Sequence, residues 1–529
     1  MAPCDFSPVK RQFLFFLLFL LIGAGGLAFR LPQLCDRPMH ADEAVQAAIF
    51  RDLWQQGRYT YNPDEFHGPT LTYATLPSAW LGGATTFAET TERTYRIVPV
   101  LFGAGVILLV WLLGDALGKP AAICAAVLAA VSPAMVFYSR YFIHETLLVF
   151  FTMAAIAAGW RYAQSDKLAW CLAAGACIGL MQATKETAVL AYVAAGIAMG
   201  FTWVWGRLWR EESPTNLPAR PRWHLALGLA AAGLVAVALL SSFFTNPRGP
   251  INGVLTYFPW FRRAVGDAYH VHPWCFYLHR AGWWRLGNGP FCSEGLILVL
   301  AAAGFVVALI PKSTLLPDAS VRFVRWLGFY TIVLTAAYSA IPYKTPWCLL
   351  EFLLGMILLA GVGAVALVRV IPTLPLKIVL GVLLLAAGVQ LARQSHRASY
   401  VLPADPCNPY VYAHTSPGIT QLASMLEQLA EASPDGHATP VKVVWSDGYY
   451  WPLPWYLRRF EDVKLWTTLP PNADAPVVLS SPQYDAALTG KLDATHLMTG
   501  FYEVRPQELV MLWVREDLWK AHLKRLGRL

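Results

Sequence analysis

The sequence predicts a multi-pass α-helical membrane protein with a small α/β domain at its C-terminus. Of the 529 residues, 56% are hydrophobic and only 14% are charged, which is too apolar for a soluble globular chain. Apolar runs long enough to cross a bilayer recur up to Leu391, and the composition changes from about Arg393 onward. We therefore predict a membrane domain over 1–392 and a domain outside the membrane over 393–529.

The apolar runs of the first part predict about eleven transmembrane helices, because a hydrocarbon core of about 30 Å needs about 20 residues per helix. The runs are Phe13–Phe29, Ile97–Leu113, Ala121–Phe137, Thr146–Trp160, Leu168–Ala183, Thr187–Trp205, Trp223–Phe244, Gly295–Ile310, Phe323–Ile341, Trp347–Val370 and Leu376–Leu391. No convincing cleavage site follows the first run, so we interpret it as a retained signal anchor.

Basic residues fall in alternate connections between these runs, as the positive-inside rule expects. This pattern predicts a protein of the cytoplasmic (inner) membrane with a cytoplasmic N-terminus and a periplasmic C-terminal domain. The net charge is +8, but the basic residues are scattered in short segments between the apolar runs, so the charge does not indicate a nucleic-acid partner. The first outward loop, Arg30–Arg96, departs from the rule by carrying several arginines. We expect these to have partners or anionic ligands.

That first outward loop contains His40-Ala41-Asp42-Glu43, followed by the helical pattern Ala44–Leu53, which predicts an interfacial helix. Adjacent carboxylates at a membrane surface are costly unless they are solvated, paired or functional. Such a carboxylate could act as a general base, or hold a divalent cation (Mg²⁺ or Mn²⁺) against a phosphate. The structural alternative is a helix N-terminus, where acidic residues complement the dipole.

Further polar residues fall on the same predicted side of the membrane. Arginine and lysine there could bind a phosphate leaving group beside a catalytic carboxylate, whereas internal ion pairs and interfacial caps are the structural alternative. The residues are His67, Arg140, His144, Glu145, Lys185 and Lys344.

The second long outward loop, Thr245–Glu294, is dense in Arg, His and aromatic residues. A Cys275–Cys292 bridge within it is compatible with an oxidising compartment. The chain has no Cys-x-x-Cys pair, so a zinc or redox motif is not supported, and no metal ligand set is predicted. It also has no Gly-rich phosphate loop.

The C-terminal part reads as an α/β domain. We expect a helix over Gly418–Ala432 and strands over Val441–Trp445, Val477–Leu479 and Leu509–Val514. Asp447 follows the first strand at a position where α/β sites often form. The aromatic run Tyr449–Trp455 could stack on sugars or dock the domain on the membrane, and we favour docking.

Taken together, His40-Ala41-Asp42-Glu43, Ser132-Pro133, Ser139-Arg140, His144-Glu145 and Thr184-Lys185-Glu186 resemble the C-type (GT-C) integral-membrane glycosyltransferases. The chain is similar to the protein O-mannosyltransferase and aminoarabinose lipid A transferase group, and within it to a subgroup of flippase-activity-associated membrane proteins. The resemblance covers the membrane part and implies a GT-C-like bundle.

The resemblance also implies a polyprenyl-phosphate-linked sugar as donor and a membrane lipid environment. Asp42 would be the catalytic base, with Glu43 assisting. Arg140, Lys185 and Lys344 would contact the lipid phosphate. The expected function is transfer of the sugar, with inversion, to an acceptor on the outer face that the sequence does not identify. The alternative is a non-catalytic lipid-linked-sugar binding or flippase-associated protein.

Overall fold

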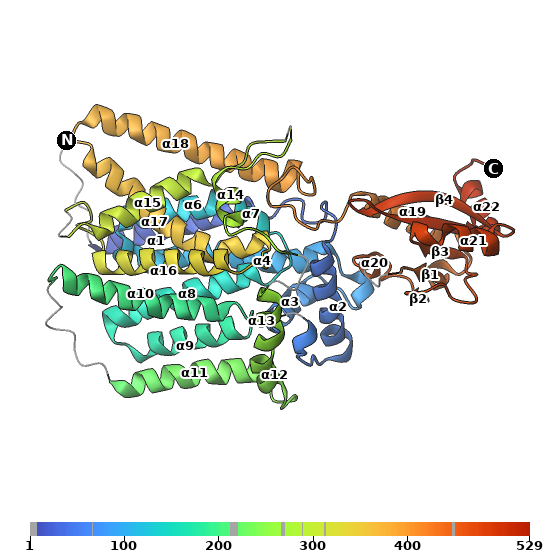
Figure 1. Cartoon of the computed structure of the whole chain (residues 1–529), viewed down its shortest axis with the longest axis horizontal. Coiled ribbons are helices and arrows are strands. Elements are labelled where there is room, and N and C mark those ends of the chain that lie inside the picture. Colours follow the sequence, from blue (N-terminus) through green and yellow to red (C-terminus); the bar gives the residue numbers. More distant parts are fainter. Residues whose placement is uncertain are drawn as a thin grey trace.

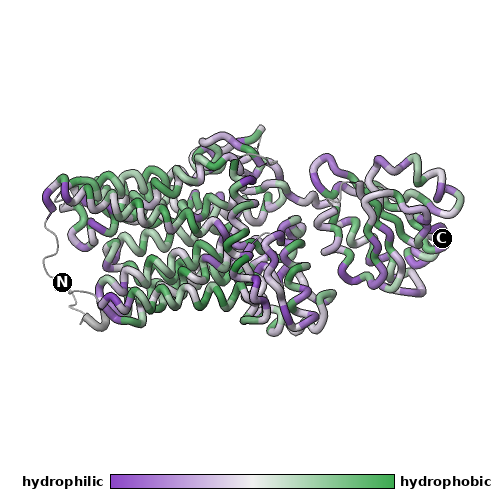
Figure 2. The backbone as a smooth tube through the Cα atoms, turned by 60° about the horizontal axis from the view of Figure 1, so that its bottom comes forward, coloured by the Kyte–Doolittle hydropathy of each residue, from purple (hydrophilic) through white to green (hydrophobic). Residues whose placement is uncertain are grey.

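A helical bundle and a small α/β domain lie end to end along the long axis of the molecule (Figure 1). The computed structural model describes residues 8–65, 67–211, 221–265, 270–287, 289–311, 314–446 and 450–529. Hydrophobic residues fill the middle of the bundle, and hydrophilic residues gather at its two ends (Figure 2). This banding is what a membrane-spanning bundle requires, because polar groups avoid hydrocarbon.

Each predicted apolar run overlaps a helix of the bundle, and the run Ala121–Phe137 is divided at Ser132 between α6 (Lys119–Val131) and α7 (Pro133–Tyr138). The helices are α1 (Pro8–Ala28), α4 (Glu92–Leu109), α6 (Lys119–Val131), α8 (Glu145–Ser165), α9 (Leu168–Gln182), α10 (Ala188–Leu208), α11 (Arg222–Leu240), α15 (Gly295–Leu309), α16 (Val321–Ala340), α17 (Leu349–Val370) and α18 (Leu374–His396). In the described chain, 6 segments are long and apolar enough to cross a membrane, beside 4 shorter apolar helices. The number of spans therefore stays a prediction.

Small residues let the central helices of the bundle approach closely. A Cβ on Gly363 of α17 would lie 1.9 Å from the carbonyl oxygen of Leu300 in α15. A Cβ on Gly175 of α9 would lie 2.0 Å from the carbonyl oxygen of Gly228 in α11. Such contacts drive helix association in lipid, where apolar burial alone gives no advantage.

Short helices cover the end of the bundle that faces the C-terminal domain (Figure 1). They are α2 (Ala41–Gln56), η1 (Pro63–Glu65), α3 (Thr70–Leu81), η2 (Phe87–Glu89), α7 (Pro133–Tyr138), α12 (Gly249–Leu255), α13 (Tyr257–Ala264), α14 (Phe276–Gly282) and η4 (Pro346–Cys348). The predicted interfacial helix is α2, but its apolar face is turned to protein: Ala44, Ala47 and Phe50 are buried in the main core. The prediction that it lies on lipid is therefore corrected.

The C-terminal domain contains a five-stranded sheet in the order β2-β1-β3-β5-β4. Its elements are α19 (Gly418–Ala432), β1 (Val441–Val444), α20 (Leu453–Tyr456), β2 (Val463–Trp466), β3 (Val477–Ser480), α21 (Asp485–Leu492), β4 (His496–Arg505), β5 (Glu508–Arg515) and α22 (Glu516–Arg525). The first three strands in this order are parallel, and β5 is antiparallel to both of its neighbours. Strands β2 and β4 were not predicted, because these edge strands are largely exposed and lack a buried apolar run.

The two cysteines suggested as a bridge are free thiols. Cys275 caps α14 at its N-terminus, whereas Cys292 is buried and its backbone pairs with Trp284. The suggested Cys275–Cys292 disulfide is therefore not formed.

Candidate functional site at the end of the bundle facing the C-terminal domain

Glu43 is a fully buried carboxylate held by two arginines. Its oxygens accept from Arg37 at 2.9 Å and from Arg96 at 2.9 and 2.8 Å. The backbone N–H groups of His40 and Phe142 also donate to it, each at 2.9 Å. Burial alone would raise the pKa of Glu43, but the guanidiniums and hydrogen bonds bring it well below its usual range. Two arginines of the first outward loop thus have the partner that the sequence led us to expect.

Asp42, the neighbour of Glu43, has a side chain that is 54% exposed. It lies in the first turn of α2, whose N-cap is His40. Nδ1 of His40 accepts from the backbone N–H of Asp42 at 3.1 Å, and Nε2 lies 3.1 Å from the carbonyl oxygen of Tyr412. Because a carbonyl only accepts, Nε2 carries the proton and His40 is neutral. His40 therefore fixes the start of α2 against the C-terminal linker, and its Nδ1 lies 4.0 Å from the exposed Asp42 carboxylate.

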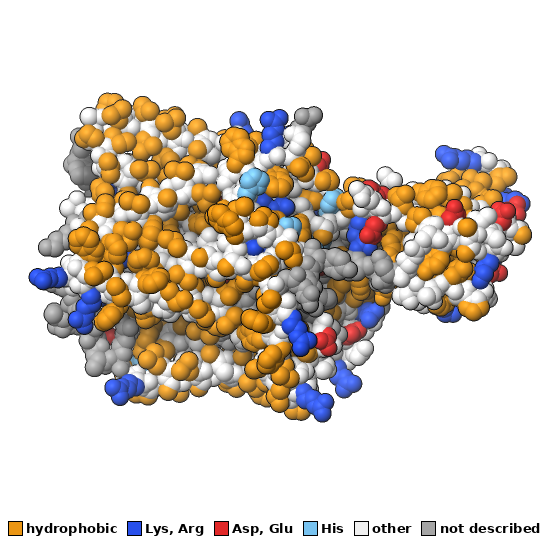
Figure 3. Space-filling model, viewed as in Figure 1, with side chains coloured by type: hydrophobic (Ala, Val, Ile, Leu, Met, Phe, Trp, Pro, Cys, Tyr) orange, Lys and Arg blue, Asp and Glu red, His pale blue; other side chains and the backbone are white. Residues whose placement is uncertain are grey.

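Two histidines of the second outward loop meet at one tyrosine near Asp42. The Tyr412 hydroxyl lies 2.7 Å from Nδ1 of His270 and 2.8 Å from Nε2 of His272. A hydroxyl has one proton, so it donates to one imidazole and accepts from the other. Burial lowers the pKa of His270, and the Asp42 carboxylate acts in the opposite direction. Histidines gather at the junction of the bundle and the C-terminal domain (Figure 3).

Lys344 joins the same network, although it is 1% exposed. Its ammonium donates to the backbone carbonyl of His272 at 3.1 Å and to that of Ile341. Both acceptors are neutral, so the positive charge of Lys344 is not cancelled by a carboxylate in these contacts.

Arg140 supports the chain that follows α1. Its guanidinium stacks on Tyr400, with 4.3 Å from Cζ to the ring centre. It donates to the carbonyl oxygens of Arg30 (2.6 Å), Pro32 (2.7 Å) and Gln33 (3.2 Å) and to the Tyr400 hydroxyl (3.1 Å). Arg140 is therefore engaged in holding the first outward loop.

Lys185 and Glu145 form a buried ion pair, and they are 4% and 2% exposed. Burial alone would lower the pKa of Lys185, but the Glu145 carboxylate raises it. The charge of Lys185 is thus neutralised inside the protein.

His67 and His144 pack edge to face, with ring centres 5.0 Å apart. His67 Nδ1 contacts Glu186 at 2.9 Å, and its ring stacks on Trp260 of α13. His144 donates from Nε2 to the carbonyl of Gly68 at 3.0 Å, and burial keeps its pKa well below the ordinary value. These histidines tie the first outward loop to α8 and α13.

The structure thus sorts the predicted residues into three networks. Asp42, His40 and Lys344 are linked through Tyr412 and His272. In the second network, Glu43 binds Arg37 and Arg96 and fixes α2, and Arg37 in turn donates to the backbone carbonyl of Arg140, whose side chain holds the first loop. The third network holds His67, His144, Glu145 and Lys185.

Sequence reasoning missed His270, His272 and Tyr412 as neighbours of Asp42. The alternation His270-Val271-His272 was a usable signal, because residues two apart share a face of extended chain. Val271 does pair with Tyr343 in a β-bridge. Tyr412 lies in the C-terminal linker, and no local pattern predicts that it returns to the first loop.

The Asp42–Glu43 pair has one carboxylate available to a Mg²⁺ or Mn²⁺ ion. Mg²⁺ is commonly bound by one or two carboxylates together with waters and substrate phosphates. Both Glu43 oxygens are occupied by arginines, which leaves Asp42 as the single carboxylate of the pair that could bind. No group of three or more His, Cys, Asp or Glu side chains in the described ranges is arranged to hold a metal ion.

A family model described as dolichyl-phosphate-mannose-protein mannosyltransferase matches residues 76–217. Among solved structures, ArnT from Cupriavidus metallidurans bound to undecaprenyl phosphate superimposes with a TM-score of 0.63 at 15% identity, covering 97% of this chain and 99% of ArnT. The chain has the GT-C glycosyltransferase fold. The oligosaccharyltransferase of Archaeoglobus fulgidus in its apo form gives a TM-score of 0.52 at 14% identity, covering 96% of this chain and 77% of that protein.

No curated protein sequence matches the chain. The GT-C match extends beyond the membrane part, because the ArnT superposition covers nearly all of both chains. It confirms the predicted fold class, while membership of the superfamily and of the flippase-associated subgroup stays a prediction.

Proposed function

We propose that this protein is a glycosyltransferase that moves a sugar from a polyprenyl-phosphate carrier to an acceptor at the outer face of the membrane, with Asp42 as general base. One observation carries the proposal: two adjacent carboxylates at that end of a GT-C bundle have opposite environments. Glu43 is buried and doubly paired, and Asp42 is 54% exposed. Glu43 is then a positioning residue for Asp42, in place of the assisting catalytic role expected from the sequence.

In this mechanism Asp42 accepts the proton of an acceptor hydroxyl or amine. The acceptor atom attacks the anomeric carbon, and the bond from that carbon to the phosphate oxygen breaks. The electron pair leaves with the lipid phosphate, and the proton remains on Asp42 until it passes to solvent. Inversion at the anomeric carbon follows from such a single displacement.

Lys344 is our preferred contact for the lipid phosphate. Its ammonium is held by two neutral carbonyls within the Asp42 network, so a phosphate could replace them and gain a charge-assisted hydrogen bond. Lys185 is less suited because Glu145 already neutralises it. Arg140 keeps its charge but is engaged by three carbonyl oxygens of the first loop and by the Tyr400 hydroxyl.

The match to ArnT with undecaprenyl phosphate and to a dolichyl-phosphate-mannose family model supports a lipid-linked donor. The sugar and the acceptor, whether protein, lipid or glycan, are left open. The distribution of basic residues supports an inner-membrane protein with its C-terminal domain in the periplasm.

The test is sugar transfer by the purified protein in lipid vesicles, with a panel of radiolabelled polyprenyl-phosphate sugars and with or without chelator. We expect turnover of at least one donor by the wild type and loss of turnover in Asp42→Asn, and the chelator arm shows whether a divalent cation on the donor phosphate is needed. Turnover that is retained in Asp42→Asn would contradict the role given to Asp42.

The alternative is a lipid-linked-sugar binding protein without catalysis, favoured by the fact that the candidate cations are all engaged in protein contacts. It predicts saturable donor binding without turnover for every donor. It also predicts that Asp42→Asn leaves binding unchanged.

A further inference from the structure

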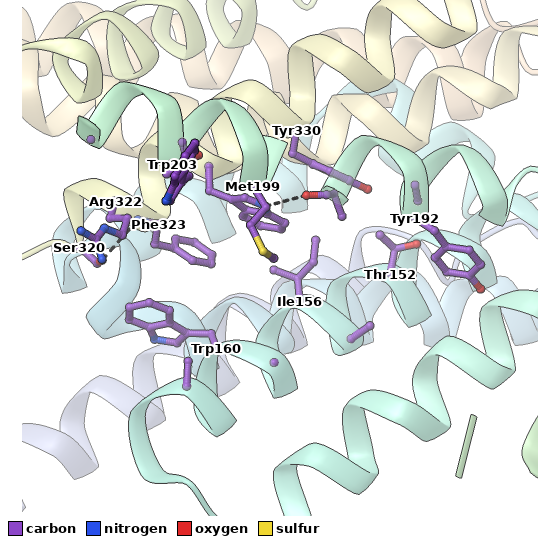
Figure 4. A pocket seen from close by; sticks show the side chains of 18 of the residues that line it. Thr152, Ile156, Trp160, Tyr192, Met199, Trp203, Ser320, Arg322, Phe323 and Tyr330 are labelled. Atoms are coloured by element: carbon purple, nitrogen blue, oxygen red, sulfur yellow. Dashed lines mark hydrogen bonds between the residues drawn. The ribbon is translucent and has the colours of Figure 1, made fainter. Parts of the chain in front are cut away.

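A cavity of about 670 Å³ lies between α8, α9, α10 and α16 and is open to the surface of the bundle, where Met199 and Trp203 are exposed. Its walls are mainly apolar, and Trp160, Met199, Trp203 and Phe323 point into it (Figure 4). Nothing in the mechanism above uses this cavity.

The cavity runs along the bundle axis. Its lining residues on α10 extend from Ala191 to Arg207, about 24 Å at 1.5 Å per residue. That is long enough for one extended lipid chain and shorter than the hydrocarbon core of about 30 Å.

Positive charge gathers at one end of the cavity. Arg207 and Arg322 line it there, together with Ser320, which caps the N-terminus of α16. Glu211 also lines this end, but it is held by Arg325 through two hydrogen bonds of 2.8 Å. Arg325, which is not part of the lining, therefore neutralises Glu211, while Arg207 and Arg322 bring positive charge to this end and the helix N-terminus adds further positive potential.

This charged end lies opposite the Asp42 site. Arg207 is at the end of α10 and Arg322 at the start of α16, far from the C-terminal domain (Figure 1). A polyprenyl-phosphate carrier whose phosphate lies at Asp42 would have its headgroup at the membrane face next to the C-terminal domain, not at the face next to Arg207 and Arg322. The charge of the cavity thus favours a lipid that enters from the leaflet on the Arg207 side, which the basic loops predict to be cytoplasmic.

We propose that the cavity is a binding site for an anionic phospholipid, with one acyl chain between α8, α10 and α16 and its phosphate at Arg207 and Arg322. Apolar walls favour the chain, and the arginines favour an anionic over a zwitterionic headgroup. This site is separate from the proposed donor site and does not depend on the proposed function.

The test is native mass spectrometry of the delipidated full-length protein with dioleoyl-phosphatidylglycerol or dioleoyl-phosphatidylethanolamine. We expect one tightly bound phosphatidylglycerol with roughly tenfold preference over phosphatidylethanolamine. Arg207→Gln with Arg322→Gln should remove that preference. The matched control is Arg222→Gln with Lys377→Gln, two basic residues at the same end outside the cavity, which should keep it.

A second variant tests the chain site without changing charge. Gly159 lines the cavity, and a Cβ there meets no atom within 4 Å, so the backbone has room for a side chain and Gly159→Leu reduces the space for an acyl chain. We expect it to abolish tight binding of both lipids. Gly196→Leu, also free of contacts but outside the lining, should not.

Phosphatidylglycerol binding that is unchanged in both Gly159→Leu and the double arginine variant would overturn the proposal. A second outcome would also overturn it: undecaprenyl phosphate displaces phosphatidylglycerol from the wild type and from the double arginine variant, but does not bind Gly159→Leu. The cavity would then hold the carrier chain.

Discussion

At the scale of single residues, burial separates two groups that the sequence presents as a pair. Asp42 and Glu43 are adjacent on α2, yet one is exposed and the other receives two guanidiniums and two backbone N–H groups. The sequence predicted that both belong to the site and that arginines of this loop have partners. It could not tell them apart, because their difference depends on Arg96 of α4 and on the backbone at Phe142.

Glu43→Gln should destabilise the fold strongly. It would leave Arg37 and Arg96 buried without a counter-charge, which costs about 3 to 5 kcal/mol. The matched control Asp42→Asn removes an exposed carboxylate next to it and should change stability by at most about 0.5 kcal/mol. Thermal unfolding in one detergent measures both, and equal stabilities of the two variants would contradict the anchoring role.

Acid should have the same effect as this substitution. Because the pKa of Glu43 is lowered in the fold, its stabilisation is complete above the unfolded pKa of about 4.3 and is lost as the pH falls further. An unfolding temperature that stays constant below that pH would argue against a charged Glu43.

Lys344→Gln should weaken donor use if the lysine contacts the lipid phosphate. Loss of one charge-assisted hydrogen bond of about 1.5 to 3 kcal/mol corresponds to a rise of roughly 10- to 150-fold in donor KM. Lys377→Gln, on α18 at the opposite end, is the control. A kcat loss without a change in donor KM would assign Lys344 a structural role instead.

At the scale of elements, the sequence predicted the helices well and the contacts between them poorly. The length of an apolar run predicts where a transmembrane helix lies, but the contacts between helices depend on side chains that are far apart in the sequence. Glu294 shows this: it precedes α15 and accepts from Ser132 at 3.0 Å and from the backbone of Ala134 at 2.8 Å, both at the start of α7. Among the described residues, its Oε2 has no hydrogen-bond partner.

Burial raises the pKa of Glu294 to about 7, although its hydrogen bonds act in the opposite direction. The folded state therefore keeps a proton that the unfolded chain releases near pH 4.3, so Glu294 lowers stability as the pH rises from about 4.5 to 7. Glu294→Gln should remove this dependence and stabilise the protein at pH 8 by up to about 3 kcal/mol. A pH series of unfolding temperatures would show parallel curves for both proteins if Glu294 were already ionised in the fold.

At the scale of the whole molecule, the C-terminal domain is docked on the loop that carries Asp42. The backbone N–H of Met39 donates to the Tyr456 hydroxyl at 2.8 Å, and the Trp455 indole donates to Glu92 at 2.8 Å. The prediction that the aromatic run docks the domain on the membrane is therefore corrected for Trp455, which is buried against the bundle. Asp447 and Tyr449 lie outside the described residues. The sequence predicted a membrane bundle and a C-terminal domain, but it did not predict that the C-terminal domain contacts the loop of the bundle that carries Asp42.

Tyr456→Phe should lower turnover several-fold with little change in donor binding, because an unsatisfied Met39 N–H loosens the segment three residues before Asp42. Tyr484→Phe removes a comparable bond from the same domain, to the carbonyl of Thr467 at 3.0 Å, far from that loop. Equal turnover in the two variants would contradict positioning by the domain.

The most direct measurement is the single-turnover rate of sugar transfer in Asp42→Asn and Asp52→Asn at saturating donor, with donor binding measured on the same samples. Asp52 lies on the same helix and is 48% exposed, so the control removes a similar charge from α2. We expect Asp42→Asn to reduce the rate by about 10²- to 10⁴-fold with donor binding retained, and Asp52→Asn to match the wild type. Equal rates in both variants would show that Asp42 is not the base.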